Sequence, residues 1–150
     1  MRYGISAAAI VIQDQRVLLV NHRQAESYDF WVPPGGKLEG SESIFECARR
    51  EAFEETGLEV ELERNVYIQE FVEGDYHFCK FFILCGSFAG DVTLAYLVPE
   101  EDFLINARFV AQDEVATMTI FPEILRDQFW ADIDAGFPHT RYLGLQHVQD

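Results

Sequence analysis

The sequence contains very little lysine. Lys37 and Lys80 are the only two, and Lys and Arg together number 11 against 26 Asp and Glu, which gives a formal net charge of −15. Because binding to a nucleic-acid backbone requires a basic surface, we do not expect a duplex-binding protein. The same deficit argues against binding to an anionic membrane surface. An acidic chain can still bind a polyanion when divalent cations lie between the two.

Cysteine and long apolar runs are scarce as well. Cys47, Cys79 and Cys85 are odd in number and form no CxxC pair, so neither a disulfide scaffold nor a zinc site is expected. No stretch approaches the roughly 18 apolar residues of a membrane span. Asp14 and Arg16 interrupt the first apolar run, which favours a strand over a signal peptide. We therefore expect a soluble, cytoplasmic protein.

The composition is that of a globular domain, with 49% hydrophobic and 25% charged residues in a chain of 150. This length predicts a single domain, residues 1–150. The apolar patterns predict an α+β fold, an α/β/α sandwich with a mixed β-sheet and two main helices. Strands are expected at 5–12, 16–21, 28–32, 58–64, 66–73 and 76–88, a strand entering a short helix at 106–115, and helices at 43–56 and 121–136. The tail after residue 136 shows no clear period.

The helix at 43–56 has defined ends. Ser43 and Glu46 have the spacing of a capping box, and Gly57 fits the left-handed position that closes a helix. Glu51, Glu54 and Glu55 share one face of this helix and lie in its last turns, where the helix dipole favours cations.

Such crowding is unfavourable unless a cation relieves it. A pair of partly buried carboxylates about 5 Å apart costs roughly 3 kcal/mol at an effective dielectric near 20. The ordinary alternative is a solvated, acid-rich helix face, on which each pair costs only a few tenths of a kcal/mol. A divalent cation would reverse the sign of these interactions, and Mg²⁺ prefers hard oxygen ligands and bridges to substrate phosphates.

The segment from Gly36 to Leu58 resembles the Nudix box, G-x5-E-x7-R-E-U-x-E-E-x-G-U, in which U is a bulky or aliphatic residue. Every fixed position matches, and Ala52 is the smallest acceptable residue at its hydrophobic position. The resemblance implies the Nudix fold and a Mg²⁺-dependent hydrolase, with Mn²⁺ as a substitute. Its substrate would be a nucleoside diphosphate linked to another group.

The resemblance also implies site residues. The metal ligands would be Glu54, Glu55, Glu51 and the carbonyl of Gly35, with Glu51 as the alternative base toward the attacking water. Catalysis would further involve Glu54 and Arg50, which orients a glutamate.

Two further roles concern the loops around the box. Glu42 would hold the preceding loop against the helix. Family members often take one more acid from a loop outside the box, and Glu100, Glu101 and Asp102 precede the strand "ARFV". Of these three acids we favour Glu101.

The expected substrate contacts are Arg23 to a phosphate and two rings, Trp31 and Tyr76, to a base. Tyr76 lies eighteen residues after Leu58, a position at which dinucleoside polyphosphate hydrolases of the family tend to have tyrosine. The proline typical of ADP-ribose hydrolases, about sixteen residues after the box, is missing. We therefore favour nucleoside triphosphates or dinucleoside polyphosphates as substrates, with a nucleoside monophosphate as one product.

Three alternatives stay open at this point. One is an ADP-ribose or nucleotide-sugar pyrophosphatase. Another is a catalytically silent module that binds a nucleotide, although such modules usually lose a glutamate of the box. The third is an isoprenoid diphosphate isomerase, against which the intact box argues. The expected partner is a small nucleotide, and a homodimer is compatible with the sequence.

Replacing either metal-binding glutamate should inactivate the enzyme. Glu54→Gln or Glu55→Gln is expected to cut turnover by at least about a hundredfold, because major electrostatic stabilisation is lost. Steady-state kinetics at saturating Mg²⁺ measure the effect. Near-normal turnover in both variants would show that these acids do not bind the catalytic metal.

Overall fold

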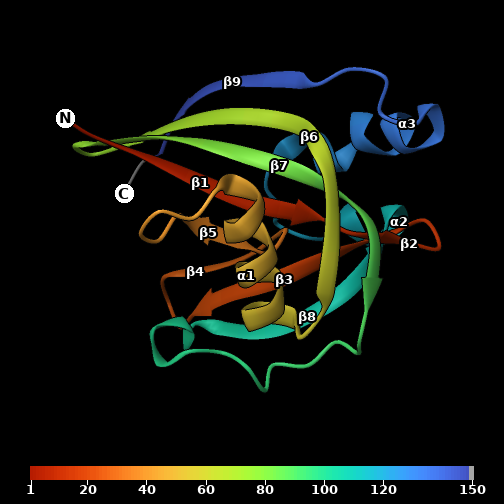
Figure 1. Ribbon diagram of the computed structural model, residues 1–150, viewed down its shortest axis with the longest axis horizontal. Helices are drawn as coiled ribbons and strands as arrows, with labels where there is room; N and C mark the ends of the chain where they lie inside the picture. Colours follow the sequence, from red (N-terminus) through yellow and green to blue (C-terminus); the bar gives the residue numbers. More distant parts are fainter. Residues whose placement is uncertain (149–150) are drawn as a thin grey trace.

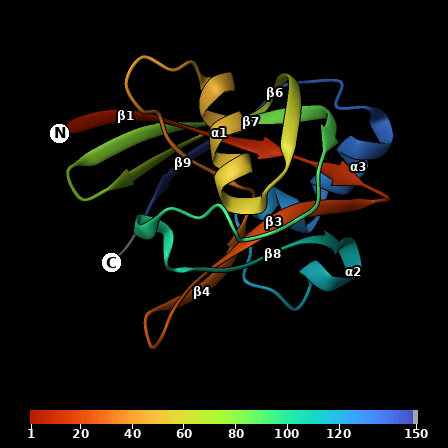
Figure 2. The ribbon, with the colours of Figure 1, turned by 60° about the horizontal axis from the view of Figure 1, so that its bottom comes forward.

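Two β-sheets form the centre of the computed structural model, which describes residues 1–148 (Figures 1 and 2). The first is a five-stranded mixed sheet in the order β5 (Gly35–Lys37), β1 (Arg2–Ile10), β7 (Tyr76–Ala89), β6 (Glu59–Glu73) and β9 (Arg141–His147). The second is a four-stranded antiparallel sheet of β2 (Ile12–Gln13), β3 (Arg16–Gln24), β4 (Tyr28–Val32) and β8 (Leu104–Ala111).

Three α-helices and two short 3-10 helices accompany the sheets in the described part of the chain. They are α1 (Ile44–Thr56), α2 (Gln112–Val115), α3 (Gln128–Ala135), η1 (Pro99–Glu101) and η2 (Glu123–Arg126). Figure 2 shows α1 in front, between the two sheets at top and bottom, with the loop that leads to η1 passing below its last turn. The predicted α+β sandwich with a mixed sheet is confirmed, and the second, antiparallel sheet is a feature that the strand pattern alone did not separate from the first. None of the helices in residues 1–148 has the length and apolar character needed to cross a bilayer.

The ends of α1 are those that the sequence predicts. The Ser43 hydroxyl accepts a hydrogen bond from the Glu46 amide at 3.1 Å, and the Glu46 carboxylate accepts one from the Ser43 amide at 3.1 Å. Gly57 adopts φ 78° and donates its amide to the Phe53 carbonyl at 2.9 Å. Both ends of the helix are thus fixed by local hydrogen bonds, which sets the position of the acids in its last turns.

Small residues bring α1 close to the mixed sheet. Ala7 and Ala9 of β1 face Ala48 and Ala52 of α1, and all four are fully buried. Alanine side chains allow the backbones of helix and sheet to approach closely, so the carboxylates near the end of α1 lie next to β5, the edge strand beside β1.

The predicted helix at 121–136 is wrong in its extent. The backbone breaks at Asp127, which has φ −141° and ψ −79°, and separates η2 from α3. The Asp127 carboxylate accepts a hydrogen bond from the amide of Gln128 and so caps α3. An aspartate that bonds to the backbone in this way favours a helix start over a helix interior.

Several strand assignments also change. The strand predicted at 5–12 is divided into β1 and β2, and β5 was not predicted. The strands predicted at 58–64 and 66–73 are one strand, β6, which contains register shifts near Leu62 and Asn65. The tail, for which no element was predicted, forms β9 parallel to β6. Arg141 of β9 donates to the Asp132 carboxylate at 2.8 and 2.9 Å, and Tyr67 donates to the same carboxylate at 2.7 Å. A side-chain network thus adds to the pairing with β6 in holding the tail.

Candidate active site

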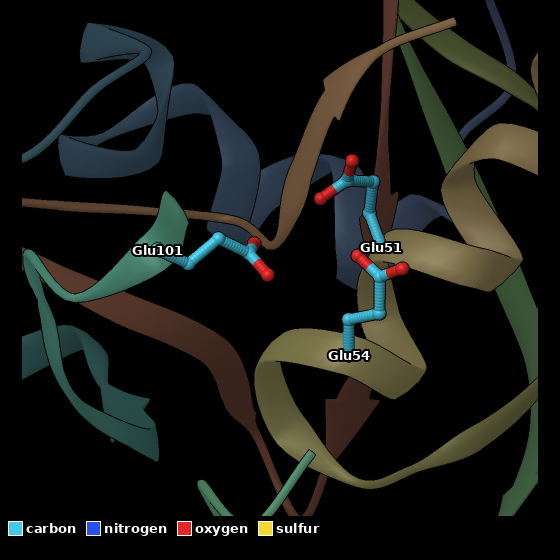
Figure 3. Close-up of side chains that lie close together, drawn as sticks. All are labelled: Glu51, Glu54 and Glu101. Atoms are coloured by element: carbon cyan, nitrogen blue, oxygen red, sulfur yellow. The ribbon is translucent and has the colours of Figure 1, made fainter. Parts of the chain in front are cut away.

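Three carboxylates from two elements gather at one point. Glu51 and Glu54 of α1 and Glu101 of η1 each offer an oxygen, and these oxygens lie within 4.8 Å of one another. Figure 3 shows Glu101 pointing from its own loop toward the two side chains on α1. The neighbouring Glu100 and Asp102 are exposed. Of the three acids considered in that loop, the structure therefore brings Glu101 to the acids of the box.

Arg50 connects most of the acids of the box. Its guanidinium donates to the Glu42 carboxylate at 2.7 and 3.1 Å, to Glu51 at 2.8 Å and to Glu54 at 3.3 Å. The hydrogen bonds to Glu42, above all, and to Glu51 raise the pKa of Arg50 further above its ordinary value. Glu42 also accepts from the amide of Glu39 at 2.8 Å, which ties the loop before the helix to the same centre. The guanidinium group of Arg50 thus fixes the orientation of several glutamates.

Glu55 lies apart from the three-acid cluster, in contact with Glu51. Its side chain is only 1% exposed, and its Oε1 has no hydrogen-bond partner among the described residues. Burial, followed by the hydrogen bond and the negative charge of Glu51, raises the pKa of Glu55 well above its ordinary value. Glu55 therefore holds its proton more strongly than an ordinary glutamate, and its ionised form lacks a full set of hydrogen-bond partners in the described residues.

The pKa values of two acids in the cluster are raised as well. Burial raises the pKa of Glu54, and the charge of Glu51 acts in the same direction. Burial is also the main cause of the raised pKa of Glu101, and the negative charges of Glu51 and Glu54 raise this pKa further. Arg50 therefore relieves only part of the repulsion among these carboxylates.

Strand β5 closes the site from the side of the mixed sheet. A Cβ atom at Gly36 would lie 2.6 Å from a Glu51 carboxylate oxygen, so a larger residue would displace Glu51. The Lys37 carbonyl, on the free edge of β5, accepts from Arg50 at 3.2 Å. Carbonyls two residues apart in a strand face the same edge, so the Gly35 carbonyl faces this side too.

The donors present fit a small, hard divalent cation. The candidate ligand atoms are all oxygens. Three carboxylates have oxygens within 4.8 Å of one another, and a fourth carboxylate, that of Glu55, has a buried oxygen without a hydrogen-bond partner in residues 1–148. Mg²⁺ and Mn²⁺ favour such ligands. The residues of the box could therefore hold the cation that the sequence predicts.

A cavity of about 280 Å³ is lined by residues of both sheets. Its walls come mainly from β4, β7, β6 and the loop before η2, and include Phe30, Phe71, Phe78, Lys80, Phe82 and Phe121. None of the carboxylates described above lines this cavity, but two observations relate it to them. The charges of Glu55 and Glu51 act on Lys80, and His22 stacks on Phe30 while also contacting Phe103, two residues after Glu101.

Neither of the two aromatic residues predicted to contact the base, Tyr76 and Trp31, lines this cavity. Tyr76 stacks on Phe78 with 5.2 Å between ring centroids, so it supports a wall of the cavity without lining it. Trp31 follows Phe30 in β4 and therefore faces the other side of that strand, where the Arg108 guanidinium lies 5.2 Å from its ring centroid.

Arg23 is well exposed at the end of β3. Its guanidinium lies 3.7 Å from the Asp29 carboxylate, and its backbone amide donates to Phe103. The structure therefore does not bring Arg23 into the cluster of acids.

Sequence reasoning missed Lys80 and Phe78 as cavity residues. The signal was present in the period of two along β7, which puts Tyr76, Phe78, Lys80 and Phe82 on one face. A lysine among aromatic side chains on the inner face of a strand is unusual, because an ammonium group is costly to bury.

The family model described as the NUDIX domain matches residues 2–129. A segment of 66 residues is 35% identical to 8-oxo-dGDP phosphatase NUDT18 of Danio rerio, and covers 44% of this chain and 20% of that protein. The chain thus aligns with only about a fifth of the length of this curated relative.

Solved structures share the fold. The MutT Nudix hydrolase from Burkholderia pseudomallei has a TM-score of 0.71 and 21% identity, covering 85% of this chain and 98% of that chain. An ADP-ribose pyrophosphatase from Streptococcus suis has a TM-score of 0.63 and 20% identity, covering 95% of this chain and 98% of that chain. With the family model over most of its length, the chain belongs to the Nudix family, a family of pyrophosphohydrolases.

The buried Glu55 should make the metal-free protein less stable as pH rises. Glutamate in the unfolded chain releases its proton near 4.5, whereas Glu55 in the folded protein holds it to higher pH. Between these values the folded state binds more protons, so raising the pH favours unfolding. Urea denaturation in EDTA at several values between about pH 5 and pH 7.5 should show a falling midpoint.

Glu55→Gln should remove most of the decrease of the urea midpoint with pH. Glu61→Gln, at an exposed position on β6, should leave this decrease unchanged. An equal slope in the Glu55→Gln protein would assign the effect to other groups.

Proposed function

We propose that this protein catalyses the metal-dependent hydrolysis of a diphosphate linkage in a nucleoside triphosphate or dinucleoside polyphosphate, with a nucleoside monophosphate as one product. The observation that supports it is the convergence of Glu51, Glu54 and Glu101, together with a cavity large enough for part of a nucleotide. The acids suit the phosphates and the aromatic walls suit a base.

The cation would be held by oxygen atoms of α1 and β5. Glu51, Glu54 and Glu55 would supply carboxylates and Gly35 its backbone carbonyl. Mg²⁺ is the cation we propose, and Mn²⁺ should replace it. When bound, it neutralises charge on the phosphates and lowers the pKa of a water molecule.

The protein's own side chains would position the carboxylates and accept the proton. Arg50 keeps Glu51 and Glu54 in place through hydrogen bonds at 2.8 and 3.3 Å. We assign Glu101 as the acceptor of the proton from the attacking water. Its raised pKa makes it a better base at neutral pH than an ordinary glutamate, and it enters the site from a separate loop.

The cavity would hold the base between aromatic side chains. Phe78 and Phe30 present rings at its walls, and Tyr76 supports Phe78 from behind. Stacking of a base on aromatic side chains contributes about 1–3 kcal/mol per base and tolerates different bases. Arg23 and Trp31 would act from outside this cavity.

The test is turnover of a substrate panel in ¹⁸O-labelled water. The panel contains nucleoside triphosphates, oxidised guanine nucleotides, dinucleoside polyphosphates, ADP-ribose and nucleotide sugars. Label is expected in a phosphate-containing product and not in the enzyme's carboxylates. Glu101→Gln should lower turnover by about a hundredfold or more, as loss of a general base does.

The adjacent Glu100→Gln is the matched control, since Glu100 is exposed and should keep normal turnover. Release of free base, label in a glutamate, or no metal-dependent turnover of any substrate would contradict the proposed function. Equal loss in the Glu100→Gln and Glu101→Gln proteins would contradict the role of Glu101.

A further inference from the structure

Lys80 is the one lysine that faces the cavity. It lies on β7 between Phe78 and Phe82, and the period of two directs all three side chains to the same wall. Its cross-strand neighbour on β6 is Gln69. An ammonium group therefore lies in a wall that is otherwise mainly aromatic.

No side chain neutralises this ammonium group by direct contact. Within residues 1–148, Lys80 forms no ion pair and no side-chain hydrogen bond, and its ammonium group lies over the Phe82 ring, 5.4 Å from the ring centroid. Burial lowers the pKa of Lys80, and the more distant charges of Glu55 and Glu51 oppose the effect. A cation in an apolar wall is unfavourable without a partner, which indicates that the partner comes with the ligand.

We propose that Lys80 is a specificity-determining residue that donates a hydrogen bond to a ring carbonyl oxygen of the substrate's base. The protein then prefers bases with an oxo group over the otherwise identical bases with an amino group. This inference rests on the proposed function and deepens it, because it concerns the base that the same site accepts.

The preference follows from the chemistry of the ammonium group. Lysine has three donors and no acceptor, so it pairs with a carbonyl oxygen and cannot pair with an exocyclic amino group. The aromatic walls stack on either kind of base and do not discriminate. Besides Lys80, Gln146 is the polar side chain among the described cavity walls, so few other groups could compensate a mismatch.

The preference for oxo bases over amino bases should be larger than a difference in the shape of the base alone would produce. A site built to make a hydrogen bond rejects the analogue that lacks the partner, because a buried polar group is then left unpaired. For a charged donor the expected discrimination is roughly tenfold to a hundredfold.

Two matched pairs of nucleotides test the proposal. ITP and ATP differ in the 6-oxo and 6-amino groups, and UTP and CTP differ in the 4-oxo and 4-amino groups. We expect the unmodified protein to prefer the oxo member of at least one pair by about tenfold or more in kcat/KM. Lys80→Met should reduce that ratio to near one, and Lys80→Arg, which keeps the donor, should retain most of it.

Arg16→Met provides the charge control. Arg16 is an exposed cation at the start of β3, beside the turn that follows β2, and its loss should leave both ratios unchanged. Dissociation constants of the four nucleotides, measured by calorimetry with Ca²⁺, report selection of the base without turnover. Lys80→Met should reduce the selectivity in binding as it does in kcat/KM.

Equal preference within both pairs in the unmodified protein would overturn the proposal, as would a preference that persists in the Lys80→Met protein. Weaker binding of all four nucleotides by a common factor would also overturn it, because Lys80 would then bind the phosphates. If no nucleotide is hydrolysed, the proposed function fails, while the calorimetric ratios still decide the role of Lys80.

Discussion

Repulsion among carboxylates is the constraint on which the rest of the site depends. Glu51, Glu54 and Glu101 hold oxygens within 4.8 Å of one another, and Glu55 is buried beside Glu51. Each such pair costs on the order of 3 kcal/mol at an effective dielectric near 20. Arg50 offsets part of this cost by contacting several acids at once. The remaining excess of negative charge is what would give the site affinity for a divalent cation.

The fold holds the acids in place although they repel one another. A capping box and a glycine fix the ends of α1, and alanines on both sides let the helix lie close to β1. Gly36 leaves room for Glu51, since a Cβ there would lie 2.6 Å from its carboxylate. Glu101 arrives from a loop that packs under the helix, where the ring of Tyr96 stacks on Phe53 at 4.5 Å. Local hydrogen bonds and close packing thus oppose the electrostatic repulsion.

Local signals explain which parts of the structure the sequence predicted. The capping residues Ser43 and Glu46 and the closing Gly57 act within a few residues, so the helix of the box was predicted to within one residue. The tail strand β9 pairs with β6, and Asp132, which binds Arg141, also accepts a hydrogen bond from the distant Tyr67, so no local pattern encodes this arrangement. The break in the second predicted helix arose from capping by Asp127, which an apolar period cannot reveal.

The residues of the site show the same difference between local and long-range signals. The carboxylates of the box follow from helical spacing, but the place of Glu101 depends on a loop distant in sequence, and the cavity depends on how the two sheets face each other. The period of two along β7 could have indicated Lys80 as an inward-facing residue. No spacing could show that the charges of Glu51 and Glu55 act on Lys80. Site residues on one element are thus predictable, whereas those that meet across elements require the fold.

The most direct test of this account is the position of the bound cation. Crystals soaked in Mn²⁺ should give an anomalous scattering peak within direct coordination distance of carboxylate oxygens of Glu51 or Glu54, on the side that faces the Gly35 carbonyl. Crystals of the Glu54→Gln protein should give a much weaker peak. A peak located away from α1, or none at saturating Mn²⁺, would contradict the claim that the crowded acids exist to bind a metal.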